Sequence, residues 1–426
     1  NDGLKAEYYV VFDPAQEVSA SNPPFLRDQF MGCAGNTPNV ICPSDPRLQN
    51  SLAKEWFEFL PQPTSSGPLN NYLAPPTPSG FLNSDTTAFT IKVDEYVGDK
   101  DHLSFSLYYR DIAPTLFSAL PDPISINTLA YLKIWMFRAN HDHTFGPNLL
   151  NHVTLGYNNA SYYGGGIDGP FAADLPQIPG VASHRFPPAI YFDAGIQGFG
   201  SASGFAQEQP WPAPAYIAND MLTWAKGRNT FVFGGEYRNL QNTFHSFSGE
   251  PGLFEFTQPG TGLYWLNSGS PIASFLLERV NWASSTFRST NDVYGRADSF
   301  VGYFGDTFKA TPKLTLNFGL RWEMHRPYAE KWDRFSFFDP QTPNPGAGGR
   351  LGALVFAGTG PGKFGARRPE KTWTRGFGPR LGLAYAVRPR MVVRTGYGIF
   401  YDMANPPGWV SGIAQDGFNT SPVFDS

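Results

Sequence analysis

The chain has 426 residues and a formal net charge of -4, and this near-neutral balance argues against a nucleic-acid partner. Its 45 Gly, 39 Pro and 16% aromatic residues, against 16% charged residues, indicate a loop-rich β protein with little helix. No apolar run of about 18 residues is present, which excludes a transmembrane helix. We expect a processed or partial chain, because it starts at Asn1 without an initiator Met or a signal-peptide-like leader.

Strand-like alternation occurs first in "KAEYYVVF" (5–12), and from Thr87 it recurs in pairs of segments joined by short polar turns. The five predicted hairpins comprise residues 87–97 and 103–110, 132–144 and 149–158, 216–225 and 230–240, 297–308 and 314–323, and 376–387 and 391–401. Long segments separate the hairpins, at 111–131, 159–215, 241–296 and 324–375. The pattern therefore predicts about ten strands, or eleven with residues 5–12.

The regular alternation of short and long connections is informative about architecture. In an up-and-down sheet it places every tight turn at one end and every long loop at the other. Outer-membrane barrels have this asymmetry, with short periplasmic turns and long extracellular loops, whereas soluble sandwiches distribute loop length more evenly. We therefore predict an all-β fold, an antiparallel up-and-down transmembrane β-barrel of which this chain supplies a part.

The predicted strands have two chemically different faces. In "KLTLNFGLRWE" (313–323), the parity of Leu316 and Phe318 is apolar and the other parity is polar. We expect the apolar parity to face lipid, and four charged residues of the other parity to face the lumen: Arg321, Glu323, Glu236 and Arg238. Aromatic residues near strand ends suit the interface between lipid and water, although aromatics also favour strands in general. These residues are Tyr96, Tyr108, Tyr109, Tyr157, Trp224, Trp322 and Tyr401.

Two long stretches carry a family resemblance. "YFGDTFKATPKLTLNFGLRWEMHRPYAEKWDRFSFFDP" (303–340) and "FGPRLGLAYAVRPRMVVRTGYGIFYD" (377–402) resemble the barrel of TonB-dependent receptors, specifically the large type with an N-terminal carboxypeptidase-regulatory-like domain. "LLNHVTLGYN", "KGRNTFVFGGEYR" and "SPIASFLLE" are similar to barrel segments of that family, and residues 39–63 to its long early extracellular loop. The resemblance implies an early strand and long extracellular loop in residues 1–86, and barrel hairpins with long loops in 87–426.

The resemblance also implies a function. Members of that family are transporters of the bacterial outer membrane, in which a barrel of roughly 22 strands is closed by a plug. An inner-membrane complex pulls on a TonB box to admit a siderophore, glycan or peptide. We find no plug domain, TonB box or regulatory-like domain in the sequence, so we expect a middle piece of a larger barrel. Its expected partners are outer-membrane lipid, a small-molecule or oligomeric ligand, and the TonB complex through parent-chain segments not present here.

Other candidate sites are weaker. The alternation places His141 and His143 of "HDH" on one face, and we interpret them as polar residues at a barrel mouth rather than a metal site. Cys33 and Cys42, an even count in an exported loop, favour a local disulfide over free thiols. Scattered carboxylates such as Glu236, Glu323 and Asp402 show no spacing that isolates a glycosidase pair, so we expect no enzyme activity, catalytic residue or cofactor.

Ligand capture would fall to the long loops. Five of their aromatic residues are candidates for stacking on a flat or sugar-like ligand, although packing between loops is an alternative for each: Trp211, Tyr264, Trp265, Trp332 and Phe335. Two other classes remain open, a non-transporting adhesion or secretion barrel and a soluble carbohydrate-binding β-sandwich. The ligand cannot be predicted, because loop sequences carry no general code.

Overall fold

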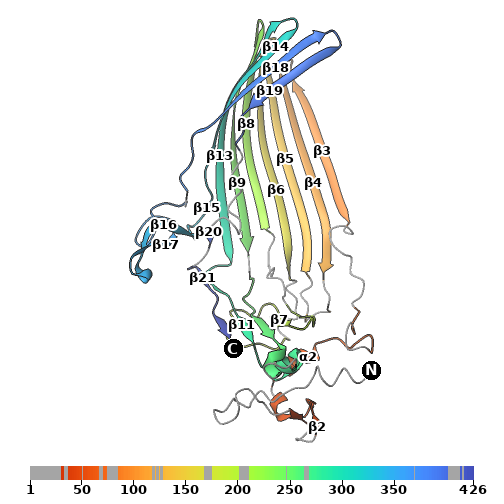
Figure 1. The fold of residues 1–426 in the computed structure, drawn as a ribbon. Coiled ribbons are helices and arrows are strands. Elements are labelled where there is room, and N and C mark those ends of the chain that lie inside the picture. Colours follow the sequence, from red (N-terminus) through yellow and green to blue (C-terminus); the bar gives the residue numbers. More distant parts are fainter. Residues whose placement is uncertain are drawn as a thin grey trace.

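The computed structural model describes residues 30–32, 37–49, 51–66, 71–73, 85–117, 120, 124, 128–166, 175–200, 211–245, 247–262, 268–368, 370–401, 413–414 and 417–426. Ten long antiparallel strands form one tall, twisted sheet (Figure 1). They are β3 (Thr86–Val97), β4 (Asp101–Phe117), β5 (Thr128–Gly146), β6 (Leu149–Gly166), β8 (Trp211–Lys226), β9 (Asn229–His245), β13 (Asp292–Thr311), β14 (Leu314–His325), β18 (Gly376–Arg388) and β19 (Met391–Gly398). Each strand pairs with the next in this order, and the two-residue strand β15 (Ala329–Glu330) pairs with β13 as an eleventh member.

Short turns join the two strands of each hairpin at one end of the sheet. Neighbouring hairpins are also connected there by a repeated backbone bond. The amide of Thr144 donates to Lys100 O at 2.8 Å, and that of Ala225 to Asn148 O at 2.8 Å. The amide of Lys309 donates to Arg228 O at 2.8 Å in the same way. These bonds continue the ladder around the turns, so the short-turn end is a regular rim.

The five predicted hairpins are confirmed as neighbouring strand pairs of this sheet. Several strands are longer than predicted, because the segments next to them keep an extended backbone despite their Gly and Pro. β5 begins at Thr128 rather than 132, and β13 begins at Asp292 rather than 297. β19 ends at Gly398, three residues before the predicted end. The predicted strand at 5–12 lies outside the described residues.

The sheet is open. β3 and β19 are its outermost strands, and the described residues contain no pairing between them. An unpaired strand edge exposes backbone N–H and C=O groups that lipid cannot satisfy. This sheet is therefore a partial region of a barrel.

At the opposite end, the long connections fold into a compact region of their own (Figure 1). It contains β1 (Met31–Gly32), β2 (Thr37–Pro38), η1 (Pro46–Leu48), α2 (Leu52–Glu58), β7 (Ala189–Phe192), β10 (Leu253–Phe256), η4 (Gln258–Thr261), α3 (Pro271–Leu276), β11 (Trp282–Ser284), β12 (Phe287–Arg288), β21 (Asn419–Thr420) and β22 (Val423–Asp425). Trp56, Phe199, Phe256 and Phe275 are buried together in its core. The described residues contain no helix that is long and apolar enough to cross a membrane.

The connection between β14 and β18 forms a second packed loop region. It consists of β15, β16 (Ser336–Asn344), η5 (Pro345–Ala347) and β17 (Arg350–Phe356), and β16 also pairs with β20 (Ile413–Ala414). Phe335, Phe337, Val355 and Ala357 pack against Val293 of β13 in a buried cluster. The long loops are thus ordered by hydrophobic burial rather than by regular pairing with the main sheet.

Candidate functional site

The strand register divides the sheet into two faces. Directly paired residues of antiparallel strands lie on the same face, so the pairings can be followed from β3 to β19. Through them, Phe89, Phe105, Leu155, Phe233, Phe318 and Leu381 share one face, which we call the apolar face. These side chains remain between 41% and 57% exposed. A continuous apolar surface of this extent is typical of a lipid-facing barrel wall.

Aromatic rings line up across this apolar face. Ring centroids are 5.2 Å apart between Phe89 and Tyr109, and 4.3 Å between Tyr109 and Trp135. Phe137, on β5 like Trp135, lies 5.9 Å from Tyr157 on β6. Aromatic pairs at these distances stabilise the sheet by more than their buried area alone when the surface is covered.

The opposite face, which we call the polar face, carries ion pairs. Arg238 Nε lies 2.6 Å from Glu236 Oε1, and Arg321 pairs with Glu323 in the same way two strands along the sheet. Val301 of β13 is paired with both Glu236 and Glu323, so all four residues share the polar face. The structure thus brings the four predicted lumen-facing residues together. That this face lines a lumen stays a prediction.

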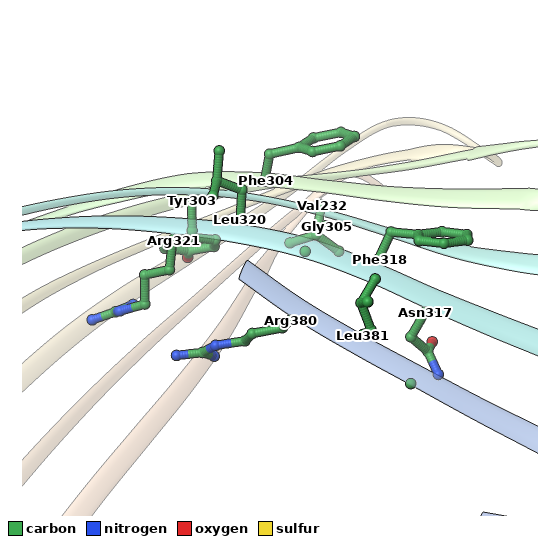
Figure 2. Close-up of a pocket in the computed structure, with 12 residues that line it drawn as sticks. Val232, Tyr303, Phe304, Gly305, Asn317, Phe318, Leu320, Arg321, Arg380 and Leu381 are labelled. Carbon is green, nitrogen blue, oxygen red and sulfur yellow. The ribbon is translucent and has the colours of Figure 1, made fainter. Parts of the chain in front are cut away.

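A groove of about 420 Å³ lies where β9, β13, β14 and β18 are adjacent. Three glycines, Gly305, Gly319 and Gly382, leave the polar face without side chains at the groove. Figure 2 shows Arg321, Arg380 and Asn317 on one side of the strands and Phe304 and Phe318 on the other. The hollow in the polar face is therefore bordered by two guanidinium groups and one amide.

Tyr303 forms the wall of this hollow on β13. Its ring lies over Gly234, where an added Cβ would be 2.2 Å from Tyr303 Cζ, so only glycine leaves room for the ring in this position. The guanidinium carbon of Arg321 lies 5.9 Å from the centroid of the Tyr303 ring. Arg321 is neutralised by Glu323, whereas no carboxylate of the described residues pairs with Arg380. The Arg380 guanidinium instead lies 4.7 Å from the Phe400 ring centroid. The hollow thus offers a cation, an aromatic ring and an amide, which suits a ligand with anionic or aromatic groups.

The predicted loop aromatics have different positions. Phe335 is only 7% exposed within the cluster around Val293, so packing accounts for it and it is not available to a ligand. Trp332 is 62% exposed, with Lys331 Nζ 4.8 Å from its ring centroid. Trp211 is the first residue of β8 rather than a loop residue. Tyr264 and Trp265 lie outside the described residues, so their proposed role stays a prediction.

Two of the aromatic residues predicted to lie at the interface between lipid and water are on the other face of the sheet. Tyr96 and Tyr108 lie on the polar face with His102 and Thr90, so they are not lipid-interface residues of the apolar wall. The prediction was wrong for them because strand propensity alone does not fix which parity an aromatic occupies.

The predicted disulfide involves a residue outside the described part of the chain. Cys33 lies there, and a disulfide between Cys33 and Cys42 stays a prediction.

The sequence did not single out Tyr303, Asn317 or Arg380. Asn317 has the same parity as Arg321 in the sequence, so its place on the polar face could have been predicted. Tyr303 and Arg380 are located on other strands, so only the register across β13, β14 and β18 brings them to the same hollow. Away from this hollow, Asp101, His141 and His143 are the described residues that could hold a metal ion.

Comparison with known proteins agrees with this architecture. The outer membrane beta barrel domain family matches residues 3–426, and the chain belongs to this family. It is accordingly a protein of the bacterial outer membrane, and the soluble carbohydrate-binding sandwich considered above does not fit. Comparison with curated proteins gives no match.

Several solved structures have a similar fold at low identity. The outer membrane transporter YddB from Escherichia coli is 12% identical over 74% of this chain and 40% of its own, with a TM-score of 0.39. The closed form of the ferric-catecholate import receptor Fiu from E. coli K12 is 12% identical over 74% of this chain and 43% of its own, with a TM-score of 0.37. The siderophore receptor PirA from Acinetobacter baumannii is 9% identical over 76% of this chain and 50% of its own, with a TM-score of 0.31. The chain therefore spans half or less of the length of these proteins.

Proposed function

We propose that the chain is the barrel segment of a TonB-dependent receptor, of the large type with an N-terminal regulatory-like domain, that takes up a bulky ligand with energy from the TonB complex. The observation that carries the proposal is the division of one sheet into an apolar face and a polar face that contains a basic, glycine-lined hollow. A transmembrane barrel needs an apolar face in contact with lipid and a polar face that lines a passage. In this proposal the TonB complex acts through other segments of the parent protein.

The side chains that border the hollow favour one class of ligand. Arg380 has no carboxylate partner among the described residues, and a guanidinium in this state can bind a carboxylate, catecholate or phosphate group of a passing ligand. Tyr303 offers a ring for stacking beside it. A siderophore or an acidic glycan fits these groups better than a neutral peptide does. The protein would act without catalytic residues and without a cofactor.

The test is ligand uptake by cells that express the intact protein. We expect uptake to require both TonB and the proton-motive force. Arg380→Ala should reduce it several-fold, while Arg394→Ala, on the same face but outside the hollow, should leave it unchanged. Surface binding without accumulation, unaffected by loss of TonB, would contradict transport and favour a non-transporting adhesion barrel. Equal uptake by the two variants would contradict the role of the hollow.

A further inference from the structure

Four of the seven histidines of the chain lie at the short-turn rim of three neighbouring strands. His102 is near the start of β4, His141 and His143 are near the end of β5, and His152 is near the start of β6. They divide between the two faces of the sheet. His141 and His143 belong to the apolar face, and His102 and His152 to the polar face.

On the apolar face, one carboxylate oxygen joins two imidazoles. Asp101 Oδ1 is 2.8 Å from His141 Nε2 and 2.6 Å from His143 Nδ1. The three donor atoms lie within 4.8 Å of one another. Asp101 is directly paired with His143, and the next pair along the apolar face is Leu103 with His141. The convergence therefore follows from the register of β4 and β5 and is held by a long ladder.

The surroundings of the group on the apolar face are mixed. Val97, Leu103, Val153 and Asn151 pair directly with its members, and the neighbouring positions Glu95 and Asp220 are polar. Asn151 Nδ2 donates to Asp220 Oδ1 at 2.5 Å beside the group. The side chains of Asp101, His141 and His143 are 32%, 41% and 27% exposed. Phe145 packs edge-on against His143 at a centroid distance of 4.4 Å and restricts the orientation of that ring.

We propose that Asp101, His141 and His143 bind a divalent transition-metal ion at the short-turn rim. Two imidazoles and one carboxylate are a donor set suited to Zn²⁺, Ni²⁺ or Cu²⁺, with the remaining positions open to water or an external ligand. Donors about 3.4 Å apart enclose such an ion at bond lengths of about 2.1 Å, so the distances of 2.8 and 2.6 Å from Asp101 to the two imidazoles need to widen by less than about 1 Å. The ion replaces the protons that the two imidazoles share with Asp101.

The ion would connect two hairpins. Asp101 belongs to the β3–β4 hairpin and the two histidines to the β5–β6 hairpin, which at this end are joined by the Thr144 to Lys100 backbone bond. Metal binding should therefore stabilise the rim between these hairpins. This inference does not depend on what the barrel transports.

The matched control lies on the other face of the same strands. Asp142 bonds His152 Nδ1 at 2.5 Å through Oδ1 and His102 Nδ1 at 3.3 Å through Oδ2. The composition is the same, but the two imidazoles bond different oxygens of the carboxylate. The geometry of this second group does not converge on one point.

The experiment is Cu²⁺ and Zn²⁺ titration of the intact protein in detergent after chelator treatment. We expect one tight Zn²⁺ site by calorimetry, and a Cu²⁺ paramagnetic resonance signal with splitting from two imidazole nitrogens. H141Q and H143Q should each weaken Zn²⁺ binding at least tenfold, while H152Q should not change it. The isosteric variant D101N should weaken binding while preserving the fold, checked by heat-modifiable electrophoretic mobility.

Two results would overturn the proposal. One is the absence of stoichiometric Zn²⁺ binding by the unmodified protein. The other is equal binding by H141Q, H143Q and the unmodified protein, or a loss confined to H152Q, which would place any metal on the polar face.

Discussion

At the residue scale, Glu330 holds the loop after β14 against the sheet. Its side chain is fully buried. Oε1 accepts bonds from the amide of Tyr294 at 3.2 Å and from Arg334 Nη2 at 2.8 Å, and Oε2 accepts from the amides of Trp332 and Arg334. A buried carboxylate is tolerable only when it is bonded this completely.

These contacts predict a pH dependence of local stability. Burial alone would raise the pKa of Glu330, but the bonds from Arg334 and from the amides of Arg334 and Trp332 hold it below the ordinary 4.5. The carboxylate therefore stabilises the loop fully above that ordinary value, and its contribution is lost as the pH falls through the lowered pKa. The hydrogen-exchange protection factor of the Ala357 amide, which donates to Phe335 O, should therefore fall as the pH drops below the ordinary pKa value of Glu330.

Glu330→Gln provides the matching variant. It should lower the free energy of local opening by about 2–3 kcal/mol at neutral pH and weaken the acid dependence. Asp333→Asn, which removes the more exposed pair with Arg367, should cost less than about 1 kcal/mol. A protection factor that stays constant with acidification in the unmodified protein would show that Glu330 does not hold the loop.

At the element scale, β14 tests which side of a strand meets lipid. Phe318 is 45% exposed on the apolar face, while the neighbouring Asn317 accepts a bond from Thr307 Oγ1 at 2.9 Å on the polar face. A cation near the centre of a lipid-facing strand costs about 2–4 kcal/mol. Phe318→Arg should therefore reduce the yield of heat-modifiable barrel in the outer membrane, and Asn317→Arg should have little effect. Equal tolerance of the two variants would argue against the assignment of faces.

The strands were predictable because their signal is local. Alternation in "KLTLNFGLRWE" and the short turns around it gave β14 its position and its two faces. Residues 292–296 were predicted to belong to the long connection 241–296 rather than to a strand. There the pairing with β9 and β15 keeps the chain extended. Tertiary pairing overrides weak local preference at such strand ends.

At the whole-molecule scale, sequence reasoning could give the order of the strands and the uneven lengths of their connections. It could not give the burial of Trp56 with Phe275, which are more than 200 residues apart in the sequence and lie in segments without periodicity. The hollow beside Arg380 escaped prediction for the same physical reason. The sequence placed His141 and His143 on one face and favoured polar residues at a barrel mouth over a metal site, because it could not show that Asp101 joins them. The hollow and this group are both assembled across strands, and cross-strand neighbours depend on a register that no single strand determines.

We expect one face of this sheet to meet lipid and the other to meet water. The most direct measurement places spin labels one at a time from Leu314 to Glu323 in the intact protein, with Cys33 and Cys42 replaced by Ser, in lipid vesicles. Collision rates with oxygen and with a water-soluble relaxing agent then report the surroundings of each position. We predict a period of two, with high oxygen accessibility at Leu316, Phe318 and Leu320 and high accessibility to the water-soluble agent at Asn317, Gly319 and Arg321. A profile without this alternation, or with the two phases exchanged, would contradict the assignment of the two faces.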